Sequence, residues 1–236
     1  MRAGPFLIAG IALAACERRT PPAPAPSADP APPPVPAGAP AAPVPQPPPR
    51  LEELRVVLGT EASLTPPAVR ADVVRRPWVG PLVEVLAEDS PDAGQDSPIL
   101  FDKKRIERPS SELAGLFSRG LDNLRKASPQ PLHERTIAAA KSRVQITQFG
   151  DNYTAARLLL PELWSKIAAD SGGRLYAAAP VRDMIVWTTS AAKADQVALR
   201  GHARTAYRSR SFPISPAILR WTARGWILAD ENPTDL

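Results

Sequence analysis

Half of the prolines in this chain lie in one stretch of 31 residues. Residues 20–50 consist almost entirely of proline and alanine and hold 15 of the 30 prolines among 236 residues. Proline fixes φ and has no N–H to donate, which excludes helices and sheet interiors. Polyproline II remains, and at about 3.1 Å per residue the stretch would reach roughly 90 Å. A Pro-rich stretch can also be a ligand for aromatic grooves, but its position favours a disordered linker over residues 16–50 that precedes a folded domain at 51–236.

The first 16 residues have the layout of an export signal. Positive charge from Arg2 and the amino terminus is followed by an apolar run at residues 6–13 and then by small residues. Such a run is too short to span a bilayer as a helix. The motif LAAC at residues 13–16 resembles the bacterial lipobox, which ends in the cysteine that receives the lipid. We therefore predict a lipoprotein signal peptide over residues 1–15.

Cys16 is the only cysteine in the chain. We predict that it carries a diacylglycerol and a further acyl chain such as palmitate, and two or more chains make a stable membrane anchor. The alternative is an ordinary signal peptide or short membrane segment with an incidental cysteine. Without a second cysteine the domain can form no internal disulfide and must be stabilised by its core. Glu17, where inner-membrane retention typically uses Asp, favours the outer membrane, with the domain facing the periplasm.

Residues 51–236 are long enough for one domain with a sizeable core. We expect helices from Ser110 to about Lys126, over 161–170 and over 191–208, strands over 78–88 and 143–149, and two hairpins, 175–179 with 184–189 and 218–222 with 226–229. Residues 153–160 fit either a return strand or the first turns of a helix. Hairpins rather than βαβ crossovers favour a single compact α+β domain.

Several of these segments resemble the YtpQ-like family of bacterial proteins, a domain of unknown function. The similar runs are LVEVLAEDSP (82–91), SELAGLFSRGLDNLRKA (111–127), FGDNYTAARLLLPELW (149–164), LYAAAPVRDMIVWT (175–188) and FPISPAILRWTARGW (212–226). The resemblance covers roughly residues 70–230 and implies a compact α+β domain. It brings no established activity or catalytic residues. Members of the family are mostly unexported, whereas here a lipoprotein signal and a linker precede the domain.

Common catalytic and cofactor motifs are missing from the sequence. It contains no G-x-S-x-G elbow, no Walker loop and no G-x-G-x-x-G. Two histidines, His133 and His202, lie far apart without a clustered partner. We therefore expect no metal site and no cofactor.

Two predicted turns carry carboxylates. Asp151 precedes Asn152 in one turn, and Asp183 follows Arg182 at the tip of the 175–189 hairpin. If the fold brings them together, two carboxylates could act as an acid and a base with separated pKa values. Asp and Asn also suit such turns for purely structural reasons, because they bond their own backbone. The sequence favours the structural interpretation and leaves catalysis open.

A second candidate site is a basic helix face. Arg200, Arg204 and Arg208 are four residues apart in the predicted helix 191–208 and would line one side of it. Such a stripe can meet phospholipid headgroups, lipopolysaccharide or an acidic cell-wall polymer. We expect no nucleic acid as a partner, because the domain is predicted to be exported. The composition itself favours a plain solvated face in an arginine-rich protein, since Arg outnumbers Lys by 23 to 6, and leaves a binding role open.

The sequence thus predicts a membrane-tethered bacterial lipoprotein of the cell envelope. Its favoured role is non-enzymatic binding of an anionic envelope polymer or a protein partner. The alternative function is a hydrolase-type enzyme that uses Asp151 or Asp183.

Overall fold

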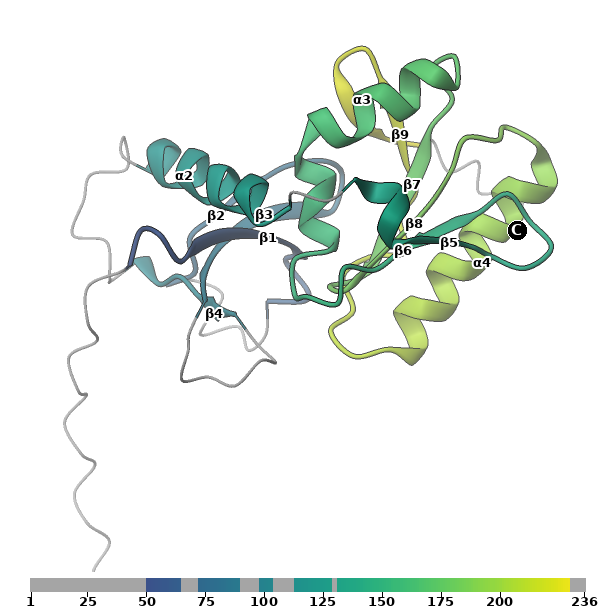
Figure 1. Ribbon diagram of the computed structural model, residues 1–236. Coiled ribbons are helices and arrows are strands. Elements are labelled where there is room, and N and C mark those ends of the chain that lie inside the picture. The colour runs from purple at the N-terminus through teal and green to yellow at the C-terminus, as the bar shows by residue number, and fades with distance from the viewer. Residues whose placement is uncertain (1–49, 65–71, 90–97, 104–112, 129–130, 230–236) are drawn as a thin grey trace, which may run out of the picture. The chain divides into compact units, whose positions relative to one another are not determined.

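The computed structural model describes residues 50–64, 72–89, 98–103, 113–128 and 131–229 (Figure 1). All of them belong to one compact unit, residues 45–236. The predicted signal peptide, Cys16 and the linker up to residue 49 lie outside the described residues. Among the helices of the described ranges, none is both long and apolar enough to cross a bilayer.

The first half of the unit forms a four-stranded antiparallel sheet. Its strands are β1 (Leu54–Thr60), β2 (Arg75–Pro77), β3 (Leu82–Glu88) and β4 (Ile99–Leu100). β3 pairs with β1, β2 and β4. Every residue of β3 is buried, including Glu84 and Glu88. Glu84 accepts hydrogen bonds from the Arg76 guanidinium at 2.7 and 3.0 Å, and Glu88 accepts one from the Arg50 backbone N–H at 2.9 Å. Both buried carboxylates therefore accept hydrogen bonds, and that of Glu84 is also paired with a cation.

Helix α2 (Leu113–Lys126) packs closely on β1, and a glycine allows the approach. A Cβ on Gly120 would lie 2.9 Å from the Val56 side chain and 3.2 Å from the carbonyl carbon of Arg55. The buried amide of Asn123 adds two hydrogen bonds, to the carbonyls of Leu51 and Leu54. The small size of Gly120 and the amide of Asn123 thus fix α2 on β1.

Gly120→Ala is expected to destabilise the domain, by about 1–3 kcal/mol, because the new methyl group crowds the branched Val56 side chain and the backbone of Arg55. Gly115 in the same helix has nothing within 4 Å of a Cβ. Gly115→Ala is the matched control, and it should stabilise by about 0.5–1 kcal/mol through helix propensity. Urea unfolding of both variants checks the prediction, which fails if the two shift stability in the same direction.

The second half forms a six-stranded antiparallel sheet. In sequence order its strands are β5 (Thr136–Ala138), β6 (Gln145–Thr147), β7 (Tyr176–Val181), β8 (Met184–Thr188), β9 (Leu219–Thr222) and β10 (Gly225–Leu228). In space the order is β10-β9-β7-β8-β6-β5. The short 3-10 helix η3 (Leu132–Arg135) precedes β5. The β7–β8 hairpin therefore lies at the centre of the sheet.

Helices cover both faces of this central hairpin. Ala178 and Val186 face α4 (Lys193–Ser209) and form a core with Leu199 and Ala203, and Figure 1 shows α4 running across the sheet. Their strand neighbours Ala177 and Ile185 join the main core, in which residues of the first sheet also lie. Successive side chains of a strand point to opposite faces, so one hairpin serves both cores.

The other face is held by tryptophans. Helix α3 (Pro161–Asp170) places Trp164, which is fully buried, edge-on against Trp187 at 6.1 Å and Trp226 at 5.5 Å. The indole N–H of Trp164 donates to the carbonyl of Arg157, in the 3-10 helix η4 (Ala155–Leu159). That of Trp226 donates to the carbonyl of Leu158. These bonds satisfy both buried indoles and fix η4 beside the sheet.

The predicted α+β class is confirmed. The helix over 161–170 and the two hairpins form where expected, and the strand expected at 78–88 begins later, at Leu82, after a turn. Residues 153–160, left open, contain the 3-10 helix η4. Ser110, the expected start of the first helix, lies outside the described residues.

Candidate functional site

The first candidate carboxylate, Asp151, is bound to an arginine inside the core. The guanidinium of Arg157 donates to its two oxygens at 2.9 and 2.7 Å, in a two-pronged geometry. The Arg157 side chain is 1% exposed and lies over the ring of Phe149, 3.8 Å from its centroid. The backbone N–H of Tyr153 donates to Asp151 at 2.9 Å, as in an Asx turn. The carboxylate thus neutralises a buried charge and shapes the turn that leads into η4.

The pKa of Asp151 reflects this pairing. Burial raises it, but the hydrogen bonds and positive charge of Arg157 outweigh burial, and the N–H of Tyr153 and the hydroxyl of Thr154 add to them. The net effect is a pKa below the ordinary value of 3.8. A general acid near neutral pH needs a raised pKa. The geometry of Asp151 therefore favours the structural role.

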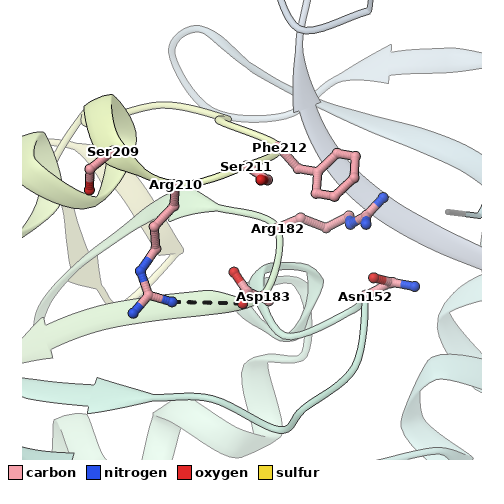
Figure 2. A pocket seen from close by; sticks show the side chains of 7 residues that line it. All are labelled: Asn152, Arg182, Asp183, Ser209, Arg210, Ser211 and Phe212. Atoms are coloured by element: carbon pink, nitrogen blue, oxygen red, sulfur yellow. Dashed lines mark ion pairs between the residues drawn. The ribbon is translucent and has the colours of Figure 1, made fainter. Parts of the chain in front are cut away.

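The second carboxylate, Asp183, lies at a surface pocket of about 450 Å³. Figure 2 shows its lining from three segments: the β7–β8 turn gives Arg182 and Asp183, the last residue of α4 and the stretch after it give Ser209, Arg210, Ser211 and Phe212, and the turn before η4 gives Asn152. We call this the turn pocket. Asp183 is paired with Arg210 at 3.8 Å, and both side chains are nearly half exposed.

Backbone pairing brings these segments together. Val181 at the end of β7 forms an isolated bridge with Pro213. The N–H of Arg182 donates to the carbonyl of Phe212 at 3.2 Å, and the N–H of Ala155 donates to the carbonyl of Arg182 at 3.0 Å. The pocket wall is therefore a continuation of the sheet, and its side chains are carried by ordered backbone.

Phe212 has an unusual backbone conformation. Its φ is +56°, in the left-handed region that bulky residues avoid at a cost of about 1–2 kcal/mol. The ring is half exposed and covers the guanidinium of Arg182, 3.7 Å from the ring centroid. The strained residue thus presents an aromatic surface at the pocket, as the upper part of Figure 2 shows.

The two candidate carboxylates play different parts in this arrangement. Asp151 is held by Arg157, and its neighbour Asn152 is the residue that reaches the turn pocket. The geometry therefore does not favour an acid–base pair formed by the two carboxylates. Hydrolysis through Asp183 stays a prediction from the sequence.

The third candidate, the basic face of α4, forms as the spacing predicts. Leu199, which belongs to the core, is buried, whereas Arg200 and Arg204 are half-buried and Arg208 is exposed. Within the described residues none of these three guanidinium groups has an acidic partner. The only acid of the helix, Asp195, accepts a hydrogen bond from the backbone N–H of Arg143. The positive charge of this face is left to solvent or to a ligand.

Apolar side chains interrupt the basic face. Val197 is 59% exposed and Tyr207 is 36% exposed. At 3.6 residues per turn, Val197 falls between Arg204 and Arg208 around the helix, and Tyr207 lies beside Arg200. We define the α4 face as these three arginines with Val197 and Tyr207.

In the part of the chain that the structure describes, no three His, Cys, Asp or Glu side chains are grouped so as to hold a metal ion. Comparison with protein-family models, curated proteins and solved structures found no match for this chain.

Three contributors to these sites carry no signal in the sequence. Arg157 lies in a 3-10 helix and pairs with Asp151, which lies outside that helix, so α-helical spacing does not predict the pair. Arg210 and Phe212 reach the turn pocket only because residue 213 bridges to β7. Arg210 and Asp183, which lies at the hairpin tip, are 27 residues apart in the sequence.

Proposed function

We propose that this chain is a lipid-anchored protein of the bacterial envelope whose domain binds anionic, phosphate-bearing lipid headgroups through the α4 face. The observation that carries the proposal is that Arg200, Arg204 and Arg208 lie on one side of a core-packed helix without acidic partners among the described residues. Arginine pairs well with phosphate oxygens because its planar fork donates two parallel hydrogen bonds.

The exposed apolar side chains favour a lipid surface over a purely polar polymer. Helices that lie on membranes combine basic residues with apolar ones that enter the boundary between headgroups and acyl chains. Val197 and Tyr207 supply such contacts beside the arginines. A solvated helix face gains nothing from exposing them.

The predicted anchor makes a weak site sufficient. A protein lipidated at Cys16 stays within reach of the membrane, and tethering raises the effective concentration of headgroups around the domain. A tethered domain therefore needs only modest intrinsic affinity to dock. We therefore expect the chain without its lipid to bind vesicles weakly, and this binding can be measured.

The test uses the predicted mature chain without lipid, residues 16–236 with Cys16→Ser, and vesicles of equal parts phosphatidylglycerol and phosphatidylcholine. Each arginine near an anionic surface contributes about 1 kcal/mol. Replacing Arg200, Arg204 and Arg208 by Gln should therefore weaken binding about a hundredfold. Co-sedimentation at fixed salt measures this, and vesicles of phosphatidylcholine alone should not bind.

A matched control separates the α4 face from general basicity. Arg119, Lys126 and Arg224 are exposed cations outside α4. Changing these three to Gln removes the same charge and should leave binding within about twofold, because charges beyond the Debye length are largely screened. Equal losses in the two triple variants would contradict a docking role for α4.

A further inference from the structure

The turn pocket combines two kinds of recognition groups. Its rim carries the guanidinium of Arg210, the carboxylate of Asp183, the amide of Asn152 and the hydroxyl of Ser211. These groups donate and accept hydrogen bonds within one concavity of about 450 Å³, a size typical of small-molecule sites. The half-exposed ring of Phe212 adds a flat apolar surface.

The backbone at Phe212 suggests that this ring is there for a reason other than folding. Burial does not require it, since 50% of the residue is exposed. Glycine or asparagine would adopt its φ of +56° with less strain. Strain that the core does not need is a pointer to a functional position.

The charges of the pocket suit a ligand with one negative charge. Two arginines and one aspartate give it a net charge of +1. The contact between Arg210 and Asp183 is long, at 3.8 Å, and solvent-exposed, so a ligand oxyanion can share the guanidinium at little cost. Arg182, packed on one face of the Phe212 ring, adds further positive potential to the pocket.

We propose that the turn pocket binds an acidic sugar, a pyranose that carries one carboxylate. The carboxylate pairs with Arg210, the ring stacks on Phe212, and the sugar hydroxyls bond to Asp183 and Asn152. Free monosaccharides and the ends of acidic polysaccharides share this chemistry. The pocket does not involve Arg200, Arg204 or Arg208, so the proposal stands apart from lipid binding by α4.

The test titrates the mature chain with Cys16→Ser by calorimetry, with galacturonate as the probe. Galactose has the ring without the charge, and acetate has the charge without the ring. Galacturonate should bind at least about tenfold more tightly than either, because a charge-assisted hydrogen bond and the ring contact are then made together. Tetragalacturonate binding more tightly than the monomer indicates a polysaccharide end as the source, and equal binding indicates a free sugar.

Variants locate the site. Arg210→Gln should weaken galacturonate binding about tenfold, and Phe212→Asn should weaken it while leaving the melting temperature unchanged or higher, because Asn tolerates positive φ. Phe212→Tyr keeps the ring and should keep binding. Arg174→Gln, an exposed arginine between α3 and β7, and the triple variant of the α4 face should bind like the parent. Acetate binding as tightly as galacturonate, no detectable galacturonate binding, or an unaffected Arg210→Gln variant overturns the proposal.

Discussion

Asp151→Asn is expected to lower the free energy of unfolding by about 3 kcal/mol, the lower end of the range for a broken buried ion pair. The variant leaves the charge of Arg157, 1% exposed, without its counterion. The lower end applies because Asp151 itself is 36% exposed, so solvent screens part of the interaction. For a domain of this size the loss corresponds to about 6–12 °C in melting temperature, which thermal or urea unfolding measures.

Two comparisons isolate the buried charge as the cause. Adding Arg157→Met to Asp151→Asn removes the stranded charge and should recover part of the loss. Asp170→Asn breaks the exposed pair with Lys166, whose side chain is 82% exposed, and should change stability by no more than about 0.5 kcal/mol. If the double variant is less stable than the single one, Arg157 stabilises the fold by packing rather than through its pair.

The same pair predicts a pH dependence. The pKa of Asp151 in the folded protein lies below its ordinary value of 3.8, so the unfolded chain takes up this proton more readily. The contribution of the pair is therefore complete above that value and is lost as the pH falls through the folded-state pKa. Stability profiles of the parent and of Asp151→Asn should converge in acid, and a constant gap down to pH 2 would contradict the ionised pair.

Cys16→Ser is expected to abolish lipidation completely. If the motif at residues 13–16 is a lipobox, only the thiol of Cys16 can form the thioether to diacylglycerol. Cells given labelled palmitate should incorporate it into the parent chain and not into the variant. Membrane association of the parent should resist high salt, because acyl chains rather than charges hold it.

A control excludes a general defect in export. Ala14→Ser keeps a small residue two positions before Cys16 and should leave labelling unchanged. Palmitate in the Cys16→Ser variant, or none in the parent, would contradict the lipoprotein proposal. The vesicle binding of the unlipidated chain is a separate test and would not be affected.

The elements predicted from the sequence are those with local signals. The helix at 161–170 has a proline at its first position and two glycines after its end, and it forms at those bounds. The β7–β8 hairpin has apolar runs on both sides of a polar turn. β1 was not predicted, because Leu54–Thr60 is a short, almost continuous apolar run, and periodicity cannot distinguish such a strand from a buried helix. η4 likewise lies in a stretch that is apolar apart from Arg157, so periodicity gives no signal for it.

The residues of the candidate sites likewise divide into those with a local sequence signal and those that tertiary structure places. The side of α4 on which the arginines lie follows from spacing, because the helical period is local. The partners of the two aspartates do not, because Arg157 and Arg210 are placed by tertiary structure: η4 is fixed by the buried indoles of Trp164 and Trp226, and Arg210 by the bridge between Val181 and Pro213. Long-range pairing of this kind has no signature in a single sequence.

The most direct test of headgroup binding uses the scarcity of cysteine in this chain. With Cys16→Ser in the mature chain, Val197→Cys creates a unique thiol in the α4 face for an environment-sensitive fluorophore. Docking through the α4 face predicts a blue shift of its emission with phosphatidylglycerol vesicles and none with phosphatidylcholine. A label at Ser165→Cys, exposed on α3, should not respond. An unchanged spectrum at residue 197, or an equal shift at residue 165, would contradict docking through α4.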